Sequence, residues 1–106
     1  MPKAAMEGLT ESMFYVLMAL TTGPLCGIDI AKEIELCTKG RLRIGPATLY
    51  TILGKFEKAG YITEISVEGR KRTYRITEKG RRAYEDELVR LRQCIADAER
   101  MKGGLL

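Results

Sequence analysis

Residues 44 to 60 read IGPATLYTILGKFEKAG, and this stretch decides the fold. Proline suits the first turn of a helix and glycine commonly ends one, so a helix is predicted from Pro46 to about Ala59. One stripe of this helix, about 100° wide, is apolar and consists of Leu49, Ile52, Leu53 and Phe56. The opposite face carries only small, hydroxylated and basic residues, with Tyr50 on its flank: Ala47, Thr48, Thr51, Gly54, Lys55 and Lys58. Because no acid lies on this face, it is free to approach a polyanion.

Two shorter helices are predicted before this one. Thr10 supplies an N-cap for an apolar run that stops at Gly23-Pro24, and a second apolar stripe marks a helix from Ile28 to Leu36. In the first helix, three large apolar residues lie outside the core stripe: Phe14, Tyr15 and Met18. This helix therefore needs cover on a second side, which another chain would supply.

A β-hairpin is predicted after Gly60. Tyr61 to Val67 is rich in aromatic and β-branched residues, Glu68 to Lys71 has turn chemistry, and Arg72 to Ile76 alternates with period two. We expect four side chains to point inward: Ile65, Val67, Tyr74 and Ile76. Three consecutive cations lie at or near the tip, where solvent or an anion is the favourable neighbour: Arg70, Lys71 and Arg72.

A long last helix is predicted to begin at Thr77-Glu78 and to carry a heptad-like seam. The seam residues are spaced 4, 3, 4 and 3 apart: Tyr84, Leu88, Leu91, Ile95 and Ala98. The seam is short for a coiled coil, so it serves either to pair two chains, which we favour, or to pack on its own domain. Cys94 lies on its rim, and Gly103 to Leu106 is expected to be a frayed end.

Charge is concentrated in the middle of the chain. Residues 39 to 82 hold twelve Lys or Arg against four Glu, a net of +8, whereas residues 1 to 38 carry −3 and residues 83 to 106 carry −1. A basic block between near-neutral flanks is typical of a surface that faces phosphate, with a plain solvated face as the alternative.

Other function classes are disfavoured by composition. The chain has no histidine, and its three cysteines form no Cys-x-x-Cys pair, so we expect no enzyme, no metal site and no cofactor. The cysteines are either packed as small hydrophobes or, for Cys94 above all, a thiol sensor. No apolar run approaches the roughly 20 residues that a membrane span needs, and no secretory signal is present, so we expect a cytoplasmic protein.

The order of the predicted elements gives a fold class and a function. The fold is mainly α with a small β-hairpin: a winged helix-turn-helix domain in residues 1–77 and a long C-terminal dimerisation helix in residues 78–106, packed on the same domain. In such motifs the second helix of the pair enters the major groove of double-stranded DNA. The candidate DNA-binding residues are Pro46, Ala47, Thr48, Tyr50, Thr51, Lys55, Arg70, Lys71 and Arg72, and the candidate homodimer interface is Phe14, Met18, Tyr84, Leu88, Leu91, Ile95 and Ala98.

Over residues 9 to 101 the sequence also resembles the PadR family of bacterial transcriptional regulators, in its short-tailed branch with one C-terminal helix. Three stretches carry the resemblance: residues 27–30, residues 44–62 and residues 69–80. It implies a winged-helix dimer that binds a pseudo-palindromic operator and usually represses. By position, Ala47, Thr48, Tyr50 and Thr51 would face the groove, Lys55 would reach phosphate, and Arg70 and Lys71 would form the wing contact.

The resemblance also implies a small apolar or aromatic inducer for some relatives. Phe14, Tyr15, Met18 and Tyr84 are candidates to line such a pocket, with plain interface packing as the alternative, and the chain has no tryptophan for an aromatic sandwich. Two other functions stay open from the sequence. One is a winged-helix protein-interaction adaptor that has lost DNA, and the other is a thiol- or metal-responsive regulator.

Overall fold

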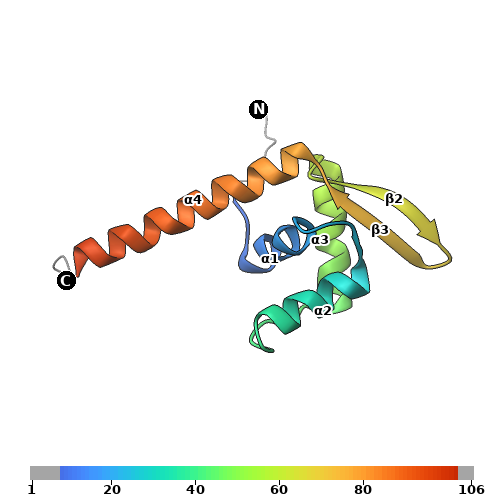
Figure 1. Ribbon diagram of the computed structural model, residues 1–106, viewed down its shortest axis with the longest axis horizontal. Helices are drawn as coiled ribbons and strands as arrows, with labels where there is room; N and C mark the ends of the chain where they lie inside the picture. The colour runs from blue at the N-terminus through green and yellow to red at the C-terminus, as the bar shows by residue number, and fades with distance from the viewer. Residues whose placement is uncertain (1–7, 103–106) are drawn as a thin grey trace.

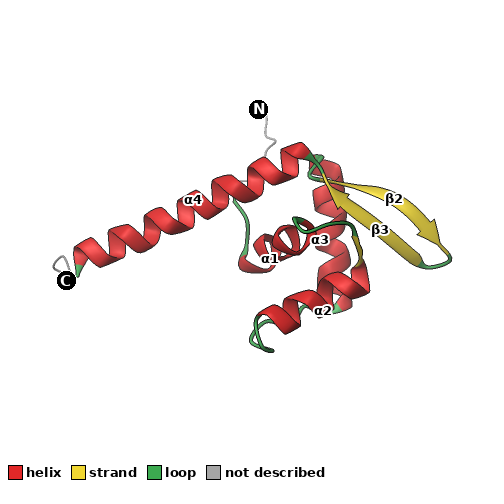
Figure 2. Ribbon diagram, in the orientation of Figure 1, coloured by secondary structure: helices red, strands yellow, loops and turns green. Residues whose placement is uncertain are grey.

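The computed structural model describes residues 8–102 and contains four helices and three strands. In chain order these are α1 (Glu11–Leu20), β1 (Leu25–Cys26), α2 (Gly27–Cys37), α3 (Pro46–Ala59), β2 (Ile62–Glu68), β3 (Lys71–Ile76) and α4 (Glu78–Met101). Figure 1 shows three short helices grouped beside a hairpin, with α4 crossing above them, and Figure 2 shows how little of the fold is strand. The winged helix-turn-helix fold that the sequence predicts is confirmed.

Both ends of α3 form as the sequence predicts. Pro46 occupies the first turn, and Gly60 follows the last residue with a left-handed φ of 82°. The Gly60 amide donates to the Glu57 carbonyl at 3.1 Å and the Tyr61 amide donates to the Phe56 carbonyl at 2.8 Å, which is the pattern of a Schellman motif. A side chain with a Cβ would be strained at this φ, so glycine both ends α3 and turns the chain into β2.

One apolar stripe of α3 packs into the hydrophobic core. Leu49, Ile52, Leu53 and Phe56 are buried, each at most 5% exposed. They pack with the stripes of α1 and α2, the base of the sheet and two residues next to these elements. The other buried members of this core are Met13, Val16, Leu17, Leu20, Ile30, Ile34, Ile44, Tyr61, Ile62, Tyr74 and Ile76. Because only this stripe of α3 faces the core, the opposite face of α3 is left at the surface.

The sheet has three antiparallel strands in the order β1-β3-β2. The sequence predicted only the hairpin of β2 and β3, because β1 has two residues and shows no periodicity. Leu25 pairs with Tyr74 and Cys26 with Thr73, so β1 covers only the base of β3. The outer part of the hairpin, the wing, projects beyond the helices (Figure 1).

The expectation that Ile65 and Val67 point inward with Tyr74 and Ile76 is wrong. Tyr74 and Ile76 are buried, but Ile65 is 44% exposed and Val67 is 49% exposed. The register shifts between Glu64, which pairs with Tyr74, and Ser66, which pairs with Thr73. Ile65 is thus the extra residue of a β-bulge, and Val67 lies on the projecting wing, where no helix covers it.

The base of the wing is joined to α3 and α4 at one junction. The Thr77 hydroxyl donates to the Gly60 carbonyl at 2.6 Å and accepts from the Gly80 amide at 3.0 Å, which caps α4. The Thr77 amide donates to the Tyr61 carbonyl at 2.9 Å. Gly80 packs so closely on Tyr61 that a Cβ there would overlap the Tyr61 carbonyl oxygen and lie 2.9 Å from Ile76 Cγ1. The angle between the wing, α3 and α4 is therefore fixed by backbone contacts.

In the described part of the chain, α4 packs on the other elements through its N-terminal part. The Tyr84 ring stacks on Phe14 of α1, with centroids 5.1 Å apart, while the C-terminal half projects away from the other elements (Figure 1). The side of α1 that carries Phe14 is thus covered by the chain's own α4, where the sequence suggested a second chain. Among residues 8–102, no helix is both long enough and apolar enough to cross a membrane.

Replacing Gly80 by alanine is expected to destabilise the fold by about 2 kcal/mol or more, because the added methyl group must displace the Tyr61 backbone. Chemical denaturation at one fixed protein concentration measures this free energy of unfolding.

Gly54→Ala is the matched control, since Gly54 is also helical but has no heavy atom within 4 Å of an added Cβ. This variant should gain about 0.5 to 1 kcal/mol from the better helix propensity of alanine. Equal stability of the two variants would contradict the close packing at the junction.

Candidate nucleic-acid interface

The outward face of α3 is exposed over its whole length. Every candidate DNA-binding residue on this helix is exposed, including Pro46, Ala47, Thr48, Thr51 and Lys55, and Tyr50 is 51% exposed. The Thr51 hydroxyl donates to the Ala47 carbonyl at 3.0 Å, so its oxygen remains an acceptor and its methyl group remains at the surface. The face therefore offers hydroxyl, methyl and phenol groups, with Lys55 at one border.

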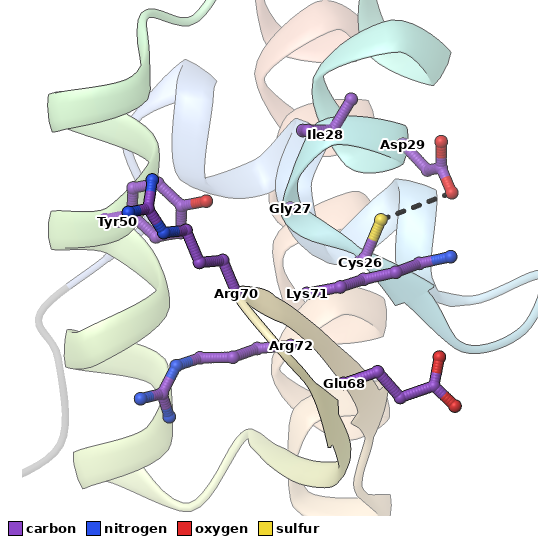
Figure 3. A pocket seen from close by; sticks show the side chains of 9 residues that line it. All are labelled: Cys26, Gly27, Ile28, Asp29, Tyr50, Glu68, Arg70, Lys71 and Arg72. Atoms are coloured by element: carbon purple, nitrogen blue, oxygen red, sulfur yellow. Dashed lines mark hydrogen bonds between the residues drawn. The ribbon is translucent and has the colours of Figure 1, made fainter.

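A hollow lies between α3, the start of α2 and the wing (Figure 3). Its volume is about 470 Å³, and it is lined by Cys26, Gly27, Ile28, Asp29, Tyr50, Glu68, Arg70, Lys71 and Arg72. In Figure 3 the side chains of Arg70 and Arg72 extend from the wing toward α3, while Lys71 and Glu68 extend away from it. The three wing cations that the sequence treated as one group therefore lie on two faces of the hairpin.

Two features of the chain open this wing-side hollow. β1 ends at Cys26, opposite Thr73, so the edge of β3 that faces α2 has no partner strand at Arg72 and Lys71. Gly27 then begins α2 close to Tyr50 of α3. The approach is so close that an added Cβ on Gly27 would lie 3.3 Å from the Tyr50 hydroxyl oxygen. The sequence analysis did not include the start of α2 in the DNA-binding surface. The two-residue strand β1, which brings the start of α2 close to the wing, has no recognisable sequence pattern.

A second hollow lies on the other side of α3, against α1. Its volume is about 370 Å³, and its lining residues are Thr10, Ser12, Met13, Ala47, Thr48, Thr51, Ile52 and Lys55. The sequence placed Thr10 at the start of α1 as a cap, and its oxygen does accept from the Met13 amide at 3.1 Å. What the sequence missed is that the start of α1 lies beside Thr48 and Lys55. The outward face of α3 is therefore a ridge between two hollows, each with at least one cation.

The loop before α3 is tied to α1 by Arg41. Its guanidinium donates to a Glu11 carboxylate oxygen at 2.9 Å and to the Tyr15 hydroxyl at 3.0 Å, and it lies 5.8 Å from the Tyr15 ring centroid. The hydrogen bond and charge of Glu11 raise the pKa of Arg41 above its usual value. Arg41 is thus a basic residue that holds the fold and is not part of the outward face of α3.

The candidate dimer residues lie on two helices and differ in burial. Phe14 is only 8% exposed because it stacks on Tyr84 within the chain, so its ring has little surface left for a second chain. Along α4 the exposure of the seam increases: Leu88 and Leu91 are half-buried, Ile95 is 59% exposed and Ala98 is exposed. The part of the seam without intrachain cover is therefore the projecting half of α4.

The four aromatic and methionine residues suggested for an inducer pocket do not lie together. Tyr15 and Met18 line a hollow of about 160 Å³ between α1 and α2, together with Ala19, Thr22, Glu33, Ile34 and Cys37. Phe14 and Tyr84 instead stack on each other at the contact between α1 and α4. Helical spacing alone did not separate these two sides of α1.

The cysteines differ in environment. Cys26 is buried and its thiol donates to an Asp29 carboxylate oxygen at 3.3 Å, whereas Cys37 and Cys94 are exposed. The expectation that free cysteines pack as small hydrophobes is therefore met within the chain only by Cys26. In the part of the chain that the structure describes, no three His, Cys, Asp or Glu side chains gather closely enough to hold a metal ion.

One charged residue is buried on the seam side of α4. Glu87 is 7% exposed and accepts from Arg90 Nε at 3.1 Å and from Arg90 Nη2 at 2.5 Å. The hydrogen bonds from Arg90 lower the pKa of the Glu87 carboxyl, against the opposing effect of burial. The apolar spacing of the seam gave no sign of this pair.

Comparisons with known proteins agree with this architecture. Residues 16–86 match the model of the transcriptional regulator PadR-like family. A transcriptional regulator from Clostridium thermocellum has a similar structure, with a TM-score of 0.75 and 29% identity over 83% of this chain and 86% of that chain.

Two further relatives cover less of their own length. Bacillus subtilis PadR, solved in complex with operator DNA, has a TM-score of 0.67 and is 24% identical, over 76% of this chain and 48% of that chain, so it shows the fold alone. An uncharacterised 37.1 kDa protein in transposon TN4556 of Streptomyces fradiae is 35% identical over 77 residues. The matched segment is 73% of this chain but 22% of that protein.

The lowered pKa of Glu87 predicts an acid-sensitive contribution to stability. A carboxylate with a depressed pKa in the folded state stabilises the fold above its unfolded pKa, and this contribution is lost as pH falls through the folded pKa. Arg90→Met should therefore lower the free energy of unfolding at pH 7, and the difference from wild type should narrow as pH falls below 4. Urea denaturation over a pH series checks this.

Arg100→Met is the control for that experiment. Arg100 also pairs with an acid three residues earlier, Asp97, but both partners are largely exposed. Exposed pairs contribute little, so this variant should match wild type at every pH. A constant difference between Arg90→Met and wild type over the whole pH range would rule out the role of the ion pair.

Proposed function

The chain belongs to the PadR-like family of transcriptional regulators, and from this premise we propose that it is a repressor that binds a pseudo-palindromic operator as a homodimer. The observation that carries the proposal is the ridge of α3, whose acid-free outward face lies between two hollows with cations at their borders. A regulator with this role works where the DNA is, in the cytoplasm.

The shape of this surface supports docking of α3 in the major groove. An α-helix fits this groove, which is about 12 Å wide and has a phosphate backbone along each side. With α3 in the groove, Thr48, Tyr50 and Thr51 would meet base edges. One backbone would run past Lys55 and the start of α1, and the other would run past the wing and the start of α2.

The two sets of residues would have different roles. Hydroxyl and methyl groups on α3 can distinguish base edges, whereas cations such as Arg70 and Lys71 bind phosphate whatever the sequence. Tyr50 lies between the two sets, since it borders the wing-side hollow. We therefore assign base reading to the middle of α3 and positioning on the backbone to Lys55 and the wing.

The projecting half of α4 supports the homodimer. Its seam continues the apolar spacing beyond the stacking of Tyr84 on Phe14, and Ile95 is 59% exposed there. Pairing two such helices would bury this surface and would place two copies of α3 on one DNA duplex, as a two-fold operator requires. A bound dimer would then hinder transcription by covering its site.

The proposal includes a small apolar or aromatic inducer, without naming the compound. The hollow of about 160 Å³ between α1 and α2 has room for a small apolar or aromatic molecule beside Tyr15 and Met18. Tyr15 also contacts Arg41 in the loop before α3, so a molecule that moved this ring would disturb the support of the recognition helix.

Replacing wing cations and α3 threonines should weaken DNA binding in two different ways. Arg70→Ala with Lys71→Ala should reduce affinity for operator and random DNA alike and lower the salt slope of log K by roughly one per lost contact, or about four per dimer. Thr48→Ala or Thr51→Ala should keep the slope and reduce discrimination by about 1 kcal/mol per half-site. Fluorescence anisotropy across a salt series measures both, after the operator is selected from random duplexes.

Arg92→Ala is the control for the wing variant, because Arg92 is an exposed cation on α4, away from both hollows. It should leave the slope almost unchanged. If the threonine variants lost affinity equally for every sequence, or the wing variant kept its slope, the assigned roles would be wrong even for a protein that binds DNA.

Leu91→Lys is expected to dissociate or unfold the dimer, because it places a charge in the seam of α4. Val89→Lys adds the same side chain where Val89 is already 61% exposed, roughly 200° around the helix from Leu91, and should leave the dimer intact. Sedimentation at micromolar concentration measures the mass of each variant. A wild-type monomer, or equal dissociation of both variants, would contradict the seam.

A further inference from the structure

Among the three wing cations, only Arg72 forms an ion pair within residues 8–102. Its Nη1 atom lies 2.9 Å from Glu64 Oε1. The side chain of Glu64 is 24% exposed and that of Arg72 is 56% exposed, so the carboxylate is the more shielded partner. Arg70 and Lys71 have no such partner in the described residues and are free to meet phosphate.

The β-bulge at Ile65 fixes the position of this pair. Glu64 is directly opposite Tyr74, and Arg72 lies two residues before Tyr74, on the same face of β3. Glu64 and Arg72 are therefore diagonal neighbours on the face of the hairpin that packs toward α3. Beyond the bulge, Val67 takes the position opposite Arg72, so no second acid of β2 shares this face near the tip.

Acids near Arg72 favour its charged form. The hydrogen bond and charge of Glu64 raise the pKa of Arg72, and the more distant charge of Glu57 on α3 acts in the same direction. Arg72 also extends toward α3 along the wing-side hollow, the path assigned above to a DNA backbone (Figure 3). A phosphate that entered this hollow would compete with Glu64 for the guanidinium.

We propose that Glu64 limits the affinity for DNA by holding Arg72 away from phosphate, and so weakens backbone binding to every sequence. This inference rests on the proposed function. Binding to random DNA is driven by release of counterions from phosphates that protein cations neutralise. A guanidinium that is already neutralised by Glu64 releases none. Base contacts of α3 do not depend on Arg72, so Glu64 weakens binding to operator and to random DNA by a similar factor and leaves their ratio unchanged.

Glu64→Gln tests this proposal, because glutamine keeps the size of the side chain and removes its charge. The variant should bind random duplex several-fold more tightly at 0.1 M salt, with a salt slope steeper by about 0.9 for each subunit bound. Its ratio of operator to random affinity should stay the same, because the released Arg72 can meet phosphate in any sequence. Fluorescence anisotropy across a salt series gives all three quantities, and circular dichroism confirms that the variant folds.

A double-mutant cycle separates the release of Arg72 from a general change of charge. In the Arg72→Gln background, the further change Glu64→Gln should no longer steepen the slope. Glu85→Gln makes the same charge change at an exposed position of α4, outside both hollows beside α3, and should also leave the slope as it is. A slope that steepens equally in the Arg72→Gln background, or in Glu85→Gln, overturns the proposal.

The outcomes also distinguish this inference from the proposed function. If wild type selects an operator but Glu64→Gln leaves the salt slope unchanged, the role of Glu64 is refuted and the regulator remains. If wild type binds no duplex at any salt concentration, the DNA-binding function fails and the role of Glu64 fails with it.

Discussion

The contact of Thr77 and Gly80 with the carbonyls of Gly60 and Tyr61 is the constraint on which the rest of the structure depends. It joins the end of α3, both ends of the hairpin and the first turn of α4 through backbone groups. A side chain at position 80 would separate these elements. Because backbone contacts cannot adjust by changing rotamer, the wing and α3 keep one relative orientation, and the wing-side hollow keeps its shape.

This rigidity matters because the interface is divided among elements far apart in the chain. One hollow combines the start of α2, one residue of α3 and the wing, and the other combines the start of α1 with α3. Arg41 ties the loop before α3 to α1, and the close approach of Gly27 to Tyr50 sets α2 against α3. These contacts hold the three helices together, as the junction holds the wing. Charge is divided in a similar way, since Arg41 and Arg72 have intramolecular partners, while Arg70 and Lys71 have no ion-pair partner among residues 8–102.

The same junction sets the direction of α4 and hence of its seam. The first turns of α4 are occupied by intrachain contacts at Gly80 and Tyr84, so only the projecting half is left for a second chain. The ion pair of the buried Glu87 with the exposed Arg90 lies between these two parts of the helix. The proposed dimer would therefore place its two DNA-reading surfaces at a distance set by the length of α4 beyond this pair.

The sequence by itself determined the helices, the hairpin, the fold class and the exposed face of α3, because periodicity, Pro46, Gly60 and Thr77 act over a few neighbouring residues. It also located the basic segment. The tertiary structure alone decided what depends on contacts between distant segments: the strand β1, the bulge that exposes Ile65, the stacking of Phe14 on Tyr84 and the pairing of Arg72 with Glu64. Local patterns show which face of an element is apolar, but the partner of each face is chosen only when the whole core packs.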